Sequence, residues 1–235
     1  MRKCIVPISG GLDSSVILHH AIDIGYEPHA VSFNYGQRHL HKELACAEKT
    51  CKKLKVSHVV LDLSFFKQIV TTSALTSDQI QVAKTKDILG DPQTVNYVPN
   101  RNMMMLSICC AYAESVGADT VFHGSALVDS QAGYWDGSKE FVQSINSLLQ
   151  LNRRDRVTVQ APLIELSKQQ IIQRGVELDV DFADTWTCYE GLDHACGECP
   201  ACSSRIKGFL DAGYIDPITY NRKDIPWKQQ GAKEL

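Results

Sequence analysis

The chain has 235 residues, of which 44% are hydrophobic, and its formal net charge is -3. This length suits one large domain or one domain with an appendage, and the composition can build a sizeable core. The slightly acidic balance excludes a globally basic, nucleic-acid-binding surface, so nucleic acid is not expected as a partner. Every apolar run is shorter than a membrane span, and a strand pattern starts at once without a leader. We therefore expect a cytoplasmic protein with no membrane anchor.

The chain contains nine cysteines, an odd number that cannot pair completely within one molecule. In a cytoplasmic protein they are expected to be thiols, and a clustered set is expected to bind a metal. Five are scattered through strand or helix patterns and are interpreted as small buried apolar residues: Cys4, Cys46, Cys51, Cys109 and Cys110. The other four gather near the C-terminus.

The first predicted elements are a strand and a helix joined by a glycine-rich turn. Residues 4–8, "CIVPI", form a continuous apolar run typical of a parallel strand covered on both faces. Residues 16–25 have nearly helical apolar spacing. Between them lies "SGGLDSS", in which Gly10 and Gly11 allow a tight turn close to a ligand. Together with its serine hydroxyls and the following helix N-terminus, this turn predicts an anion-binding loop.

The pattern SGGxDS is typical of loops that bind the pyrophosphate of ATP in enzymes that release AMP. It lacks the ending of a Walker loop and the third glycine of the dinucleotide fingerprint. An ordinary glycine-rich turn with a Ser or Asp helix cap is the alternative. Asp13 is expected either to hold Mg2+ or to cap the helix. The predicted ATP-binding residues are Ile8, Ser9, Gly10, Gly11, Leu12, Asp13, Ser14, Ser15, Val16, Ile17 and Leu18.

Strands and helices then alternate along the chain. Further strands are predicted at 29–35, 57–63, 118–124 and 157–163. Further helices are predicted at 41–55, 101–117, 139–151 and 167–178. This alternation predicts an α/β fold, with a Rossmann-like, mainly parallel five-stranded sheet and helices on both faces. Ligands of such sheets bind beyond the carboxyl ends of the strands, where "SGGLDSS", "FNYGQRH", "HGSALVD" and "APLIELS" all lie.

Residues 64–98 interrupt the rhythm, because they are polar and lack a sustained period. They are longer than an ordinary connection and predict either a mobile flap or a small excursion. We divide the chain into an ATP-binding, adenylating α/β domain at 1–180 and a small helical, metal-binding C-terminal region at 181–235.

Four cysteines near the C-terminus have the spacing of a metal site. Cys196, Cys199 and Cys202 form C-x-x-C-x-x-C, and Cys188 precedes them by eight positions. Four thiolates can surround one Zn2+ tetrahedrally in a closed, structural site. An iron–sulfur cluster also takes four thiolates, and free or redox-active thiols are a further alternative. His194 lies within the loop, but four cysteines suffice without it.

Several long motifs resemble those of the 7-cyano-7-deazaguanine synthase family, a pyrophosphate-loop ATPase family of the queuosine pathway. They are "SGGLDSS", "FNYGQRHLHKE", "VPNRNMMMLSICCAYAESVGAD", "APLIELSKQQIIQRGVEL", "TWTCYEG" and "CGECPACSSRIKGFLDAGYIDP". The resemblance implies an ATP-dependent carbon–nitrogen ligase that converts 7-carboxy-7-deazaguanine and ammonia to the nitrile through adenylated acid and amide intermediates. It also implies a homodimer with a bound structural zinc and Mg2+ with ATP.

The resemblance also implies roles for individual residues. Asp13, Arg101 and Lys168 are the candidate catalytic residues, and Arg101 is the first candidate for a phosphate contact. Arg38 and Lys168 are further candidates for phosphate contacts. The candidate substrate contacts are Tyr35, Gln37, Arg38, Asp129 and Tyr134.

One segment departs from the family pattern. Where the family commonly reads "SGYPDCRPEF", this chain reads "SQAGYWDGSKEF", so that Gly137 and Ser138 replace a Cys-Arg pair. An arginine there could clamp the substrate carboxylate, and its loss leaves open an enzyme that stops at the 7-amido compound. A tRNA-modifying adenylating enzyme and a zinc-stabilised binding module remain further alternatives.

Overall fold

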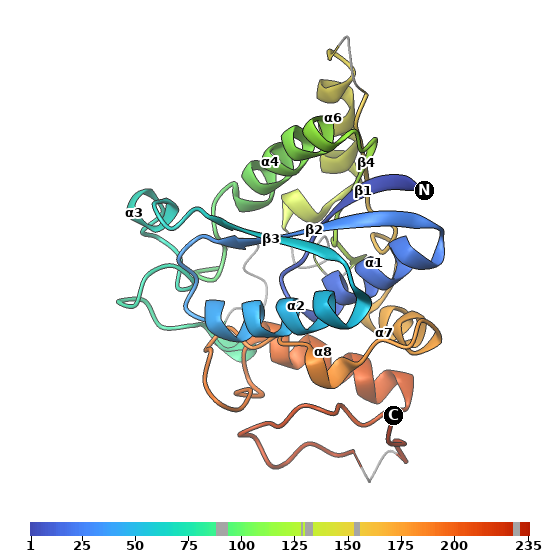
Figure 1. Ribbon diagram of the computed structural model, residues 1–235. Helices are drawn as coiled ribbons and strands as arrows, with labels where there is room; N and C mark the ends of the chain where they lie inside the picture. The colour runs from blue at the N-terminus through green and yellow to red at the C-terminus, as the bar shows by residue number, and fades with distance from the viewer. Residues whose placement is uncertain (88–93, 128, 130–133, 153–155, 228–230) are drawn as a thin grey trace.

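The computed structural model describes residues 1–87, 94–127, 129, 134–152, 156–227 and 231–235 (Figure 1). Its centre is a five-stranded sheet with the strand order β3-β2-β1-β4-β5. Each neighbouring pair of strands is parallel, which confirms the predicted sheet. The strands are β1 (Arg2–Pro7), β2 (Tyr26–Asn34), β3 (Ser57–Asp62), β4 (Thr120–Phe122) and β5 (Thr158–Gln160).

Helices cover both faces of this sheet, as predicted. Figure 1 shows α4 and α6 on one face and α1, α2, α7 and α8 on the other. Each of the predicted long helices is present, within a few residues of the expected bounds. The helices are α1 (Leu12–Asp23), α2 (Leu40–Leu54), α4 (Arg101–Val116), α6 (Lys139–Leu149), α7 (Lys168–Glu177) and α8 (Pro200–Ala212).

The apolar residues of β1 divide between two cores. Ile5 packs into the core on the side of α4, whereas Cys4 and Val6 pack into the core beneath α1 and α7. Successive side chains of a strand point to opposite faces, and both faces are buried here. This double burial explains why the first predicted strand reads as a continuous apolar run.

The strand order reverses beside β1. The chain moves outward from β1 to β2 and β3, and then returns to place β4 on the other side of β1. Connections that leave in opposite directions open a crevice at the carboxyl ends of the two central strands. The loop that follows β1 and the "HGS" segment that follows β4 therefore meet at this crevice.

The irregular segment 64–98 is a packed excursion wherever it is described. It contains the short helix α3 (Phe66–Ile69) and the 3-10 turn η1 (Thr85–Asp87). Ala74, Leu75 and Val98 are buried in the core on the α4 side, and residues 88–93 lie outside the described part. Ala74 N–H also donates a 2.6 Å hydrogen bond to Val95 O. Of the two alternatives, the structure supports the excursion.

The C-terminal region shares the cores of the α/β domain. Phe209 of α8 joins the core that contains Val6, and α8 packs along α7. The boundary near residue 180 remains a prediction. Among the described residues, none of the helices has the length and apolar character needed to cross a membrane.

A buried ion pair fastens this region internally. Arg205 Nε and Nη2 donate to the two oxygens of Asp216 at 2.6 and 2.9 Å, and both side chains are at most 1% exposed. The Tyr220 hydroxyl donates to the same carboxylate, while Arg205 also donates to Thr185 Oγ1 and Phe182 O. Every charged group of the pair thus has hydrogen-bond partners, which its burial requires.

We predict that Asp216→Ala lowers the free energy of unfolding by about 3–5 kcal/mol, because it leaves the buried Arg205 charge without its counter-ion. The matched control is Asp211→Ala on α8, the helix that carries Arg205; it removes the exposed pair with Lys207 and should cost at most about 1 kcal/mol. Urea denaturation of the two variants measures the difference. Equal losses of unfolding free energy in the two variants would show that the buried pair contributes no more to stability than the exposed pair.

Candidate functional site

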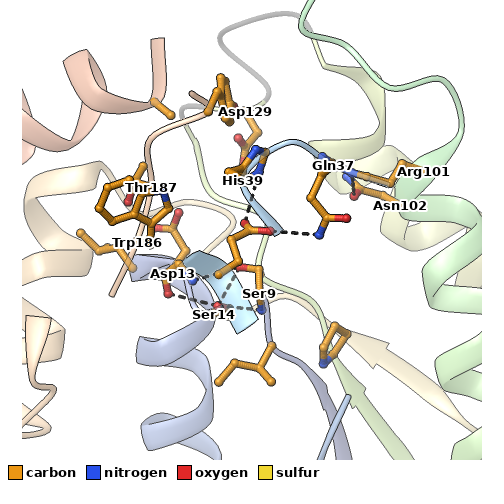
Figure 2. Close-up of a pocket in the computed structure, with 18 of the residues that line it drawn as sticks. Ser9, Asp13, Ser14, Gln37, His39, Arg101, Asn102, Asp129, Trp186 and Thr187 are labelled. Atoms are coloured by element: carbon orange, nitrogen blue, oxygen red, sulfur yellow. Dashed lines mark hydrogen bonds and ion pairs between the residues drawn. The ribbon is translucent and has the colours of Figure 1, made fainter. Parts of the chain in front are cut away.

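A cavity of about 360 Å³ lies at the crevice between the ends of β1 and β4. Figure 2 shows the side chains that converge on it, from the loop after β1, the segment after β2, the start of α4 and the chain around Trp186. The volume falls within the range of small-ligand sites. The three ligand-facing motifs that follow β1, β2 and β4 all contribute to it.

The glycine-rich loop adopts a conformation that only glycine tolerates. Gly10 has a φ of +79°, and a Cβ there would lie 2.1 Å from the main-chain oxygen of Glu43. Ser14 Oγ donates to Gly11 O at 3.1 Å and accepts from Ser9 N–H at 3.3 Å, so the side chains brace the turn (Figure 2). The loop is therefore rigid and close-packed against α2, as a cradle for an anion requires.

The N-terminal ends of four helices face this cavity. Leu12 begins α1, Arg101 begins α4, Lys168 begins α7 and Pro200 begins α8, and all four residues line the cavity. Helix N-termini carry unpaired N–H groups and the positive end of the helix dipole. Their convergence makes the cavity suited to a strongly anionic ligand such as a polyphosphate.

Asp13 and Lys168 form an ion pair at the mouth of the loop. Lys168 Nζ donates to both carboxylate oxygens of Asp13, at 2.6 and 2.7 Å. Asp13 does not cap α1, because Gly11 occupies the N-cap position and no side chain caps this end. Ser167 and Gln170 form a capping box that holds the start of α7 and hence Lys168.

Arg101 lies at the opposite side of the cavity, held by Tyr35. Its Nη1 donates to the Tyr35 hydroxyl at 3.2 Å, and its guanidinium also lies over the Tyr35 ring. Asn100, which precedes it, has a φ of +56°, so the chain turns sharply into α4. Both predicted residues, Arg101 and Tyr35, line the cavity. Figure 2 shows Arg101 beside Asn102 at the edge of the site.

Other predicted site residues divide between the cavity and the surrounding structure. Ile8, Ser9, Gln37, Asp129 and Tyr134 line the cavity together with the first residues of α1. The remaining predicted ATP-site residues are buried in the protein and do not line it: Gly10 of the loop, and Ser15, Val16, Ile17 and Leu18 of α1. The α1 residues support the loop from behind.

Arg38 turns away from the cavity. Its Nη2 donates to Ser77 O at 2.9 Å and to Ile80 O at 3.0 Å, and its Nη1 lies 3.8 Å from a Glu190 carboxylate oxygen. These contacts tie the excursion at 64–98 to the segment after β2. The structure therefore gives Arg38 a structural position and does not bring it to the ligand side.

The segment that departs from the family pattern packs directly on Asp129. A Cβ on Gly137 would lie 2.6 Å from the Asp129 Cβ, so a cysteine there requires Asp129 to move. Ser138 caps α6 by accepting from Phe141 N–H. Burial raises the pKa values of Asp129 and Asp136 above their usual range. Within this segment, residues 130–133 lie outside the described part.

Several polar cavity residues were not singled out from the sequence, among them His39, Glu43, His123 and Ser125. His123 Nε2 lies 2.5 Å from Ser125 Oγ, and burial lowers the pKa of His123 to about 4, so its ring is neutral near pH 7. His39, His123 and Ser125 belong to the "FNYGQRH" and "HGSALVD" segments that follow β2 and β4. Their position directly after parallel strands was the sequence signal that could have identified them as cavity residues.

The four clustered cysteines come together as predicted. One sulfur from each of Cys188, Cys196, Cys199 and Cys202 lies within 4.8 Å of the others, and Cys196 Sγ is 3.9 Å from Cys202 Sγ. Tetrahedral Zn2+ with four thiolates places its sulfurs about 3.8 Å apart. The donor set thus fits a structural metal such as zinc. Thr187 and Tyr189, on either side of Cys188, line the cavity, so the cluster supports one of its walls.

The parallel sheet, the SGGxDS loop and the cavity at the strand reversal together define a Rossmann-like protein of the pyrophosphate-loop class. A family model described as "Queuosine biosynthesis protein QueC" matches residues 3–213. The chain belongs to this family, and the resemblance seen in its motifs is confirmed.

Several curated sequences are similar over nearly the whole chain. "7-cyano-7-deazaguanine synthase 1" of Colwellia psychrerythraea is 39% identical over 219 residues, which cover 93% of this chain and 99% of that protein. The "7-cyano-7-deazaguanine synthase" of Caldicellulosiruptor bescii is 41% identical and covers 96% and 100%. That of Thermoplasma volcanium is 40% identical and covers 94% and 92%.

Solved structures show the same fold at low sequence identity. The NMN synthetase of Francisella tularensis aligns with a TM-score of 0.50 and 15% identity, over 97% of this chain and 82% of that one. The U34-tRNA thiolase NcsA of Methanococcus maripaludis aligns with a TM-score of 0.50 and 16% identity, over 88% and 63%. These likenesses support the Rossmann-like fold.

We predict that Cys199→Ala lowers the metal content and the thermal stability together, because one of four thiolates is lost from a site that holds the cavity wall. Elemental analysis of the purified variant should give well below the one Zn per chain expected for the unchanged protein. Cys110→Ala, at a buried cysteine of α4, is the control and should keep its metal. Full metal content in the Cys199 variant would remove this residue from the site.

Proposed function

We propose that the protein synthesises 7-cyano-7-deazaguanine from 7-carboxy-7-deazaguanine, ammonia and ATP, and that it is a carbon–nitrogen ligase. The observation that carries the proposal is the meeting of the SGGxDS loop, Lys168 and Arg101 at one cavity. The names of the similar proteins support the choice of substrate and product.

In the proposed first step, a carboxylate oxygen of the substrate attacks the α-phosphate of ATP. The bond to the β-phosphate breaks, and an acyl-adenylate and pyrophosphate form. The N-terminal ends of the converging helices would neutralise the pyrophosphate as it leaves. Lys168 and Arg101 would supply cationic charge on opposite sides of the transferred group. Such catalysis depends on placing reactants and stabilising charge.

The same site can serve the later steps. Ammonia displaces AMP from the acyl carbon and gives the amide. A second ATP then activates the amide oxygen, and elimination of AMP with loss of the two amide protons gives the nitrile. Both activations use the same chemistry at the α-phosphate, so one pyrophosphate loop suffices for both.

Two metal ions have proposed roles. The carboxylates of Asp13 and Asp129 both line the cavity and are the groups that would hold Mg2+ with ATP. Mg2+ would supply further neutralisation of the phosphates. Zn2+ on the four cysteines would have a structural role, because the closed thiolate set leaves no open position.

The remaining expectations concern the setting of the reaction. We expect a homodimer in the cytoplasm, with ATP, the 7-carboxy compound and ammonia as its ligands. Nucleic acid is not an expected partner, since the net charge of -3 gives no general attraction to phosphate backbones.

We predict that Asp13→Ala lowers kcat/KM by about 10²–10⁴-fold while the fold stays intact, because Lys168 loses the carboxylate that positions it. Circular dichroism checks the fold, and quantification of AMP and pyrophosphate checks the chemistry. Asp23→Ala, near the other end of α1, is the control and should have ordinary activity. Release of ADP and phosphate by the unchanged protein would contradict the adenylation mechanism.

The packing at Gly137 favours a second candidate, an enzyme that stops at 7-amido-7-deazaguanine. Asp129 occupies the space that a side chain at position 137 would need, and Ser138 serves as a helix cap. Gly137, which packs on Asp129 of the cavity wall, and Ser138 stand where the family pattern has Cys and Arg, while the loop at the ATP end is complete. A missing cation would weaken binding of an acid more than that of a neutral amide.

We predict that the double variant Gly137→Cys, Ser138→Arg shifts the product from amide toward nitrile if the unchanged protein accumulates the amide. Mass spectrometry of the products made with excess ATP and ammonium measures the ratio. Ser138→Thr, which keeps a capping hydroxyl, is the control for the helix end. Complete conversion to nitrile by the unchanged protein would rule out the second candidate.

A further inference from the structure

Glu43 presents a mostly buried carboxylate to the cavity without a permanent cationic partner. It lies in the first turn of α2, and 16% of its side chain is exposed. Its Oε2 accepts a 3.2 Å hydrogen bond from Gln37 Nε2. Among the described residues, no Lys or Arg nitrogen lies within 4.0 Å of its carboxylate. Burying a carboxylate is costly unless a cation compensates it, so this arrangement points to a cationic ligand.

His39 stands beside this carboxylate but does not neutralise it. Its Nε2 lies 3.6 Å from Glu43 Oε1, and the side chain is 4% exposed. Burial lowers the pKa of His39, and the charges of Arg101 and Arg38 lower it further, against the opposing effect of Glu43. A neutral imidazole can offer a lone pair at Nε2. In the tautomer protonated at Nδ1, Nε2 and Glu43 Oε1 are two acceptors 3.6 Å apart, and one donor group beside them could lie about 2.8 Å from each.

Gln37 fixes the carboxylate in this position. Its Nε2 also donates to Phe33 O at 3.0 Å, and its Oε1 accepts from Tyr35 N–H at 3.0 Å. All of its strong hydrogen-bonding groups are therefore engaged, and the amide cannot rotate without losing them. Gln37 is only 5% exposed, so water does not compete strongly for these hydrogen bonds. Figure 2 shows Gln37 and His39 on the same side of the cavity, with the glycine-rich loop below.

We propose that Glu43 and His39 form the binding site for ammonium, the nitrogen donor of the reaction. This inference rests on the proposed function. Ammonium is small, cationic and carries only donors, which matches a carboxylate and an imidazole lone pair at the edge of the cavity. Mg2+ fits less well, because it requires near-octahedral oxygen ligands and this corner offers one carboxylate.

The site would also deliver the free base. Ammonium passes one proton by way of His39 Nε2 to water, and the released lone pair forms the carbon–nitrogen bond with the acyl carbon of the adenylate. The bond from that carbon to the AMP oxygen breaks, and its electron pair leaves with AMP. The nitrogen loses its second proton to Glu43 as the amide forms. This second proton passes to water when the products leave.

The test compares Glu43→Gln with Glu48→Gln, an exposed glutamate of the same helix. Glu43→Gln removes the charge but keeps an oxygen that can accept from Gln37. Two readouts are needed for each variant. The first is the KM for ammonium chloride at saturating ATP and 7-carboxy-7-deazaguanine. The second is acid-dependent exchange of labelled pyrophosphate into ATP without ammonium, which reports adenylation alone.

We expect Glu43→Gln to raise the KM for ammonium at least about tenfold, with exchange within about threefold of the unchanged protein. Glu48→Gln should change neither. If Glu43→Gln folds poorly, His39→Asn serves as the second test variant. It places a good N-cap residue at the start of α2 and should also raise the KM for ammonium at least about tenfold.

Three results would overturn the inference. An unchanged ammonium KM in a folded Glu43→Gln variant removes Glu43 from the ammonium site. If Glu43→Gln raises the KM for 7-carboxy-7-deazaguanine in the pyrophosphate exchange assay, Glu43 instead binds the deazaguanine substrate. If the variant needs a higher Mg2+ concentration for exchange, Glu43 instead binds the metal. Absence of exchange in the unchanged protein is a separate outcome, which counts against the proposed function itself.

Discussion

The close contact between Gly10 and the main chain of Glu43 is the constraint on which the site depends. The 2.1 Å that would separate a Cβ from the Glu43 oxygen leaves room for glycine alone. This contact seats the anion-binding loop directly against the first turn of α2. The Trp186 N–H, which donates to Gly10 O at 2.8 Å, fastens the C-terminal region to the same point. One glycine thus joins the loop after β1, the helix after β2 and the cavity wall beside the four clustered cysteines.

Much of this architecture could be predicted because local sequence and tertiary structure agree. The run "CIVPI" is apolar throughout because both faces of β1 are buried. The spacing of Cys188, Cys196, Cys199 and Cys202 was informative for a similar reason, since a tetrahedral site demands close thiolates. Where a residue pattern follows from one local requirement, such as burial of both strand faces or close thiolates, the structure can be predicted from the sequence alone.

The rest depended on contacts between distant segments. Arg38 has the same motif context as Gln37, yet its side chain binds carbonyls of the excursion at residues 77 and 80. Glu43 reads as an ordinary acidic residue in a helical first turn, and its burial beside His39 appears only when α2 packs on the loop. The packing of Asp129 against Gly137, which leaves no space for a side chain at position 137, likewise has no signature in either segment. Side-chain direction, more than element order, was the missing information.

The central claim is that the cavity activates a carboxylate by adenylation. The most direct measurement uses 7-carboxy-7-deazaguanine labelled with ¹⁸O in its carboxylate, together with ATP and ammonium, and follows the label by mass spectrometry. Attack by the carboxylate on the α-phosphate predicts that one ¹⁸O atom appears in the phosphate of AMP. Label in inorganic phosphate or pyrophosphate, with unlabelled AMP, would contradict the account.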